Sequence, residues 1–307
     1  MMLDPATPIV DRRRARIADV AAAANVSVMT ASRALRGVEG VSAKKRAEIE
    51  RLAVEMNYVP NGNARSLVIA NSTLIGISVP NLLNDVFPEI LFGMRGALTS
   101  AGFETVIDTT EYDDGREEAW VRRLMGWNPA AVILTGVHHS AKTRQWLRGT
   151  GVPTLELWDC CDDPIDICVG INHFQAGQSI GRHVESLGYR RPAFVGVAEG
   201  LDLRADARLQ GIRAAFQSGA GIPVMAVQGS RLLSFQAGFE GTQRLLAQAD
   251  LRPDVVFYLS DHIAFGGMMA LQAAGLDIPG DIGVVGFNAL NICNVLPRPL
   301  TTVRTPR

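Results

Sequence analysis

The sequence lacks apolar runs of membrane-spanning length and has few cysteines. A membrane helix needs about 20 consecutive apolar residues, and no run within the 307 residues reaches that length. The 4 cysteines form no C-x-x-C pair, and free cysteines behave mostly as small hydrophobes. The first residues include Asp4 and no apolar stretch of the signal-peptide kind. These absences argue against a membrane protein and a disulfide scaffold, so we expect a cytoplasmic protein.

Signatures of cofactor and metal binding are also missing. The sequence has no P-loop and no G-x-G-x-x-G dinucleotide motif, so we expect neither an enzyme nor a cofactor. His138 and His139 are adjacent, but no third ligand lies nearby in the sequence, and we interpret them as part of a loop with no metal. One acidic cluster is interpreted as the solvated start of a helix: Asp113, Asp114, Glu117 and Glu118.

The net charge of −1 conceals an uneven distribution. Residues 1–70 hold 11 Lys and Arg against 7 Asp and Glu, a balance of +4, whereas the rest of the chain has a balance of −5. A basic segment joined to an acidic body suggests that the basic segment meets phosphate groups. The run Arg12–Arg16 could equally be a solvated tail.

From Leu74 onward, short β-branched runs alternate with amphipathic helical patterns, which is typical of parallel sheets built from βαβ units. So many strands suggest two sheets. We expect strands at Leu74–Val79, Glu104–Asp108, Ala131–Leu134, Pro153–Leu157, Ile167–Ile171, Pro192–Val197, Val224–Val227, Val255–Leu259 and Gly283–Phe287. Helical patterns lie at Phe87–Ala101, Gln175–Leu187, Leu203–Ser218, Phe235–Ala249 and Ile263–Ala274.

Residues 16–58 predict three short helices, of which the first two form a helix-turn-helix. Asn25 occupies the turn, where a left-handed conformation is needed, and Ser27 is placed to cap the second helix. Val28 is spaced to face inward with Ala31 and Leu35. The outer face of the second helix is then polar and basic, as major-groove reading requires: Met29, Thr30, Ser32, Arg33 and Arg36. A small helical lid on an enzyme is the alternative.

The segment from residue 41 to residue 80 closely resembles the LacI family of transcription factors. The resemblance begins at residue 16 and extends to residue 307, and within the family the segments GVPTLELWD and PIDICVGINHFQAG are most similar to gluconate-operon repressors. Its motifs are Asn57–Asn61, Ala64–Leu67, Gly188-Tyr189 with Arg191, Arg208–Gly211, Ser260-Asp261, Gly286–Asn288 and Pro299–Val303.

The resemblance implies a homodimer that binds double-stranded operator DNA. Val28, Met29 and Arg33 match positions that read base edges, although Val28 and Met29 could instead be core residues. Ser27, Thr30, Ser32 and Asn61 match positions that touch phosphates or lock the helices. Leu67 matches a leucine wedged between base pairs at the operator centre.

The resemblance also implies a bilobed α/β body like that of periplasmic sugar-binding proteins, with two parallel sheets and an effector in the cleft. The implied effector residues are Phe87, Trp158, Phe174, Arg208, Asp261 and Asn288. The aromatic residues could instead pack in the core. Asp261 could be only a helix cap, Arg208 a surface ion pair and Asn288 a turn residue.

The implied domains are an arm at 1–15, the helix-turn-helix at 16–60, a hinge at 61–72 and the body at 73–307. Within the body, we expect an N-terminal lobe at about 73–171 plus 300–307 and a C-terminal lobe at about 172–299. The chain looks shorter at its C-terminus than the family pattern. We expect a repressor controlled by a small sugar acid such as gluconate; the alternatives are a sugar-binding protein and an inactive truncated regulator.

Overall fold

The computed structural model describes residues 15–59, 72–83, 85–230, 234–248 and 252–306. The chain divides into two compact units, residues 1–70 and 71–307, which are described separately. The predicted hinge residues Asn61 and Leu67, and most of the predicted arm, lie outside the described residues. Within the described ranges, no helix is both long and apolar enough to cross a bilayer.

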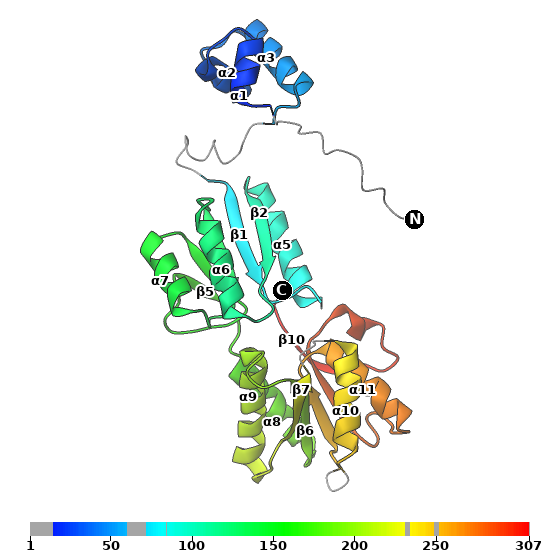
Figure 1. Cartoon of the computed structure of the whole chain (residues 1–307). Coiled ribbons are helices and arrows are strands. Elements are labelled where there is room, and N and C mark those ends of the chain that lie inside the picture. The colour runs from blue at the N-terminus through cyan, green and yellow to red at the C-terminus, as the bar shows by residue number, and fades with distance from the viewer. Residues whose placement is uncertain (1–14, 60–71, 84, 231–233, 249–251, 307) are drawn as a thin grey trace, which may run out of the picture. The chain divides into compact units, whose positions relative to one another are not determined.

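The first unit is a three-helix head with α1 at Ile17–Ala23, α2 at Val28–Leu35 and α3 at Ala43–Glu55 (Figure 1). Asn25 adopts a φ of 51° in the turn before α2, as its position predicts. The Ser27 hydroxyl caps α2 by accepting a hydrogen bond from the Thr30 amide. The core is made largely of small side chains, which allow the helices to cross closely: Val20, Ala21, Ala24, Ala31, Ala34, Ile49 and Ala53.

The body has two five-stranded parallel sheets, which confirms the predicted fold class. The first sheet has the order β2-β1-β3-β4-β5, and the second has the order β10-β9-β8-β6-β7. The strands of the first sheet are β1 Leu74–Val79, β2 Glu104–Thr109, β3 Ala131–Thr135, β4 Thr154–Leu157 and β5 Ile167–Val169. Those of the second are β6 Pro192–Val197, β7 Met225–Ser230, β8 Val255–Tyr258, β9 Gly283–Asn288 and β10 Thr301–Arg304.

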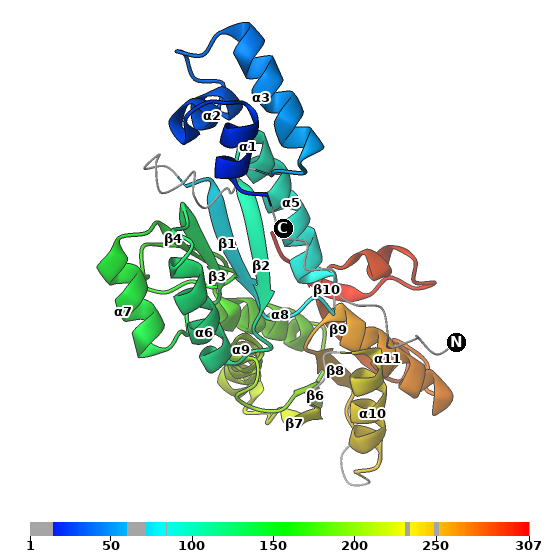
Figure 2. The ribbon, with the colours of Figure 1, turned by 45° about the horizontal axis from the view of Figure 1, so that its top comes forward.

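Helices accompany each sheet and define two lobes (Figure 2). Helix α8 packs against α9, and α10 packs against α11, all in the second lobe. The helices are α5 Val86–Ser100, α6 Asp114–Met125, α7 Ala141–Thr150, α8 His173–Ser186, α9 Leu203–Ala220, α10 Phe235–Leu246, α11 Asp261–Ala273 and the 3₁₀ helix η1 Asn291–Asn294.

The end of the chain differs from the expected lobe boundary. The sequence predicts that residues 300–307 belong to the N-terminal lobe, but Thr301–Arg304 forms β10 and pairs in parallel with β9 in the second sheet. The Thr302 hydroxyl also donates to Oδ1 of Asp261 at 2.6 Å, which ties β10 to α11. Leu290 lies between β9 and β10 and is fully buried in the core of the first lobe. The chain therefore enters the first lobe before it returns to the second sheet.

Candidate functional site

The second helix of the head presents an apolar tip at its N-terminal end. Met29 is 65% exposed and Val28 is 48% exposed, so the alternative that they are core residues is wrong for both. The inward orientation expected for Val28 is also wrong, since Ala34 is the buried residue that joins Ala31 in the core. Ser27 and Arg33 are exposed, while Thr30 and Ser32 are half-buried. Their contacts with DNA remain predictions.

In the body, four of the six predicted effector residues line one small cavity of about 30 Å³. Phe87 of α5 and Trp158 after β4 come from the first lobe, and their rings meet edge to face with centroids 6.2 Å apart. Arg208 of α9 and Asn288 of β9 come from the second lobe. The cavity therefore lies between the lobes, at the carboxyl ends of strands, where α/β folds place ligands.

Arg208 is held rigidly at this cavity. Its Nη1 donates to Nδ1 of His173 at 3.0 Å, its Nη2 donates to the Leu259 carbonyl at 3.4 Å, and its guanidinium lies 4.3 Å from the Phe287 ring centroid. Because the guanidinium can only donate, Nδ1 of His173 must be the acceptor, and its Nε2 donates to the Trp158 carbonyl at 2.8 Å. Burial, followed by the charge of Arg208, lowers the pKa of His173 to about 3.

Arg204 is a cavity residue that the sequence interpretation missed. It lies one helical turn before Arg208 on α9, and its Nε donates to Oδ1 of Asp202 at 3.2 Å. Its guanidinium carbon lies 5.9 Å from the Phe87 ring centroid and 5.7 Å from that of Tyr112. Its Nη1 is buried and has no hydrogen-bond partner among the described residues. The i, i+4 spacing from Arg208 was the available signal, because it places both side chains on one helix face.

Asp202 is the carboxylate that accompanies these two guanidinium groups. Burial alone raises its pKa, but the charges of Arg204 and Arg208 and the hydrogen bond from Arg204 outweigh burial and leave the pKa below the ordinary value. The pKa of Arg204 is raised, since Asp202 and Tyr112 overcome the effect of burial. The pKa of Arg208 is lowered, chiefly by burial. The cluster thus combines two cations with one carboxylate.

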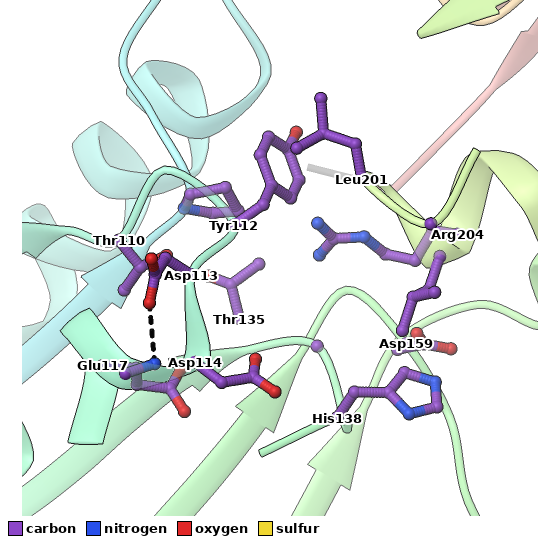
Figure 3. A pocket seen from close by; sticks show the side chains of 15 residues that line it. Thr110, Tyr112, Asp113, Asp114, Glu117, Thr135, His138, Asp159, Leu201 and Arg204 are labelled. Atoms are coloured by element: carbon purple, nitrogen blue, oxygen red, sulfur yellow. Dashed lines mark hydrogen bonds between the residues drawn. The ribbon is translucent and has the colours of Figure 1, made fainter. Parts of the chain in front are cut away.

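A larger chamber of about 380 Å³ adjoins the cavity, and Tyr112 and Arg204 line both (Figure 3). We call it the acidic chamber. The carboxylate of Asp113 faces it and also caps α6, where its Oδ1 accepts from the amides of Gly115 at 2.8 Å and Arg116 at 2.9 Å. The polar side chains lining it are Thr110, Tyr112, Asp113, Asp114, Glu117, Thr135, His138, Asp159 and Arg204.

The two remaining predicted residues line neither space. Phe174 lies on α8 and is 40% exposed. Asp261 is fully buried, and both its oxygens are engaged: Oδ2 accepts from the Leu290 amide at 2.8 Å, and Oδ1 accepts from Thr302. Asp261 is not the cap of α11 either, because the Ser260 hydroxyl has that role. The structure therefore gives Asp261 a contact that joins three segments of chain.

The interpretation of the acidic cluster as solvated is wrong for Glu117. Glu117 is buried, and its Oε1 lies 2.6 Å from Nδ1 of His139, whose side chain is also buried. Nε2 of His139 lies 3.4 Å from Oε1 of Glu156. Burial lowers the pKa of His139, but the hydrogen bonds to the two glutamates raise it to about 9. Among the described residues, no cluster of His, Cys, Asp and Glu suits a metal ion.

One catalytic motif occurs by chance. Residues Gly177–Gly181 read G-x-S-x-G, but Ser179 lies within α8 and not at the strand-to-helix turn that a nucleophilic serine needs. The two glycines serve packing, since a Cβ at Gly177 would lie 2.2 Å from the carbonyl oxygen of Arg208 and one at Gly181 would lie 2.8 Å from Cβ of Ala215. Both allow α8 to approach α9 closely.

A helix-turn-helix head joined to a bilobed, ligand-binding type of body defines a class of DNA-binding regulators. Residues 16–61 match the family of bacterial regulatory proteins, lacI family, and residues 182–307 match the periplasmic binding protein-like domain. The chain belongs to the LacI family, and it is a DNA-binding transcriptional regulator and not an enzyme.

Full-length relatives agree with this assignment. The chain is 34% identical to the HTH-type transcriptional regulator GntR of Pseudomonas aeruginosa, covering 96% of the chain and 85% of the relative. It is 32% identical to GntR of Escherichia coli K12, with 96% and 88% covered. A solved LacI-family transcriptional regulator from Silicibacter pomeroyi superposes with a TM-score of 0.86 at 35% identity, covering 94% of this chain and 87% of that one.

Proposed function

We propose that the chain is a repressor that binds operator DNA as a homodimer and releases it when a small sugar acid enters the space between the lobes. The observation that carries the effector class is the cluster of the buried Arg204 and Arg208, in which Asp202 is the buried carboxylate and the partly buried Asp159 lies near Arg204. A buried excess of positive charge is costly unless it is paired. An anionic effector supplies that pairing and binds more favourably than a neutral molecule of the same shape.

The aromatic walls suit the remainder of a sugar acid. Phe87, Tyr112 and Trp158 offer apolar faces to C–H groups, as ligand sites usually combine apolar walls with a few oriented polar groups. Ser260 and Asn288 line the same cavity and bring hydroxyl and amide groups that can bond to hydroxyls. The resemblance to gluconate-operon repressors supports gluconate as the first compound to examine.

Control of DNA binding follows from the position of this space. Its walls come from both lobes, so an effector that contacts both changes the relative stability of different lobe arrangements. The effector can weaken DNA binding only to the extent that it prefers an arrangement in which the two heads of a dimer no longer fit the operator. A repressor therefore requires an effector with different affinities for the two arrangements.

The exposed face of α2 supports the DNA-binding part of the proposal. Val28 and Met29 can contact thymine methyl groups, while Arg33 can reach base edges or phosphates. Helix α3 adds exposed basic side chains for phosphate contacts, among them Lys44 and Arg51. Such contacts predict that affinity falls steeply as salt concentration rises.

An electrophoretic mobility shift experiment tests the proposal. Operator fragments are first selected from genomic DNA with the full chain, and the shift is then repeated with gluconate and with glucose as a neutral control. We expect gluconate to release the DNA at concentrations where glucose does not. Equal release by gluconate and glucose would contradict the proposal that the effector is an anion. If no DNA were selected, the proposal that the chain represses by binding operator DNA would be wrong. Cross-linking of the free chain tests the homodimer.

A further inference from the structure

We propose that the effector carries a single negative charge, that its carboxylate pairs with Arg204, and that the acidic chamber rejects a second anionic group such as a phosphate ester. The inference deepens the proposed function and rests on it, because it assumes that a sugar acid binds between the lobes. It differs from the sequence interpretation, in which Arg208 binds the carboxylate.

The first step is the comparison of the two guanidinium groups. The terminal nitrogens of Arg208 donate to His173 and Leu259, so a carboxylate would have to displace existing partners. Arg204 is only 7% exposed, yet no described residue accepts a hydrogen bond from its Nη1. A buried donor without an acceptor is unfavourable. A ligand oxygen at this position therefore gains a charge-assisted hydrogen bond and removes an existing penalty.

The second step is direction. The guanidinium of Arg204 extends into the acidic chamber, with Tyr112 on one side and Asp159 on the other (Figure 3). A Cβ at Gly136 would lie 3.6 Å from Nη1 of Arg204, so the absence of a side chain at this position leaves the space beside the guanidinium open. The guanidinium of Arg204 thus borders the larger space, while its unpaired Nη1 is itself buried.

The third step is size. The cavity between Phe87 and Asn288 holds about 30 Å³, which is about the share of one water molecule in the liquid. The acidic chamber holds about 380 Å³, within the usual range for small-molecule sites of about 300–1,000 Å³. In this arrangement of the lobes, the acidic chamber has room for the hydroxylated chain of a sugar acid, and a carboxylate at Arg204 would lie where the chamber adjoins the small cavity.

The fourth step is the charge of the chamber walls. Asp113, Asp114 and Asp159 line the chamber together with the hydroxyls of Thr110 and Thr135. Carboxylates accept hydrogen bonds from hydroxyl groups and repel anions at short range. The start of α6 would ordinarily attract a phosphate, but the carboxylate of Asp113 already accepts from its first free amides. The wall carboxylates would therefore repel a phosphate ester, whereas a hydroxyl group at the same place donates a hydrogen bond to them.

Calorimetric titration of the full chain tests the inference with three probes: gluconate, 6-phosphogluconate and glucose. We expect gluconate to bind at least about tenfold more tightly than either of the others, since like-charge contacts and an unmatched guanidinium each cost more than about 1.4 kcal/mol. Comparable binding of 6-phosphogluconate and gluconate would overturn the exclusion of a second anion.

Variants separate the two parts. Arg204→Gln should weaken gluconate binding at least about tenfold, with partial recovery in Arg204→Lys, while the exposed Arg182→Gln on α8 is a matched control. Asp113→Asn retains a helix-capping side chain. Combined with Asp114→Asn, it should bring the affinity for 6-phosphogluconate closer to the affinity for gluconate.

Thermal unfolding confirms that each variant folds. Unchanged gluconate binding in Arg204→Gln overturns the carboxylate assignment alone, whereas a native chain that binds no probe overturns the proposed function as well.

Discussion

His173 and Arg208 form a buried pair in which Nδ1 of a neutral imidazole accepts from Nη1 of the guanidinium at 3.0 Å. The same imidazole donates through Nε2 to the Trp158 carbonyl. Arg208 belongs to the second lobe, and Trp158 belongs to the first. One histidine, at the start of α8, thus connects the cation of the cavity to the loop that carries its aromatic wall.

This pair predicts a loss of stability in mild acid. The pKa of His173 is about 3 in the folded chain and about 6.5 when unfolded, so the unfolded state binds more protons as pH falls below 6.5. Between pH 7 and pH 5, His173 should lower the free energy of unfolding by about 2 kcal/mol. Urea unfolding at both pH values measures it. The His173→Gln variant cannot titrate at this position, so its free energy of unfolding should fall by about 2 kcal/mol less than that of the native chain. Equal losses in the two chains would contradict the assignment.

His139 predicts the opposite pH dependence. Its folded pKa of about 9 exceeds the unfolded value of about 6.5, so its contribution is complete below pH 6.5 and is lost as pH rises through 9. From pH 7 to pH 9.5 the free energy of unfolding should fall by about 2 kcal/mol through this group. The same unfolding experiment applies, with His139→Gln for comparison. A variant with the same alkaline loss as the native chain would show that His139 is not the titrating group.

Asp261 should matter for stability more than for effector affinity. Asp261→Ala leaves the buried Leu290 amide without an acceptor and removes the partner of Thr302, which should cost about 2–4 kcal/mol. Thr302→Val should cost about 1 kcal/mol. Asp277→Ala, which breaks an exposed ion pair with Arg298, is the control and should cost less than about 1 kcal/mol. Chemical unfolding orders the three, and a neutral Asp261→Ala would contradict the structural role.

Met29 should influence operator choice. Its side chain is exposed on α2, so Met29→Ala should change the preferred base at one position of each half-site, with a cost of about 1–3 kcal/mol at that base pair. Selection from randomised operator DNA measures the preference. Val54→Ala, at an exposed apolar position of α3, should leave the selected motif unchanged. A motif that is identical for Met29→Ala would show that this side chain reads no base.

Local signals in the sequence predicted the elements well. Asn25 in the turn and Ser27 at the start of α2 both act as expected, because a turn conformation and a helix cap depend on neighbours within about three residues. The alternation of strand and helix patterns likewise predicted two parallel sheets, since burial on both faces requires continuous apolar runs. The strand β10 was missed because the exposed and half-buried Thr301–Arg304 has no such run.

The resemblance to the family, which rests on the sequence alone, predicted Phe87, Trp158, Arg208 and Asn288 as effector residues, and the structure places these four at one cavity. Tertiary structure alone decided the remaining roles. Asp261 is engaged by Leu290 and by Thr302, which lie 29 and 41 residues later in the chain. Glu117 is buried because His139, 22 residues away, supplies a partner.

The difference between Arg204 and Arg208 has the same origin. Both residues lie on one face of α9, so the helix itself does not distinguish them. Arg208 has an acceptor in His173, 35 residues earlier, whereas Nη1 of Arg204 has none within the part of the chain that the structure describes. Helix periodicity determines which residues share a face, but the partners of a buried charge come from distant segments, and those partners determine which guanidinium is free to bind a ligand.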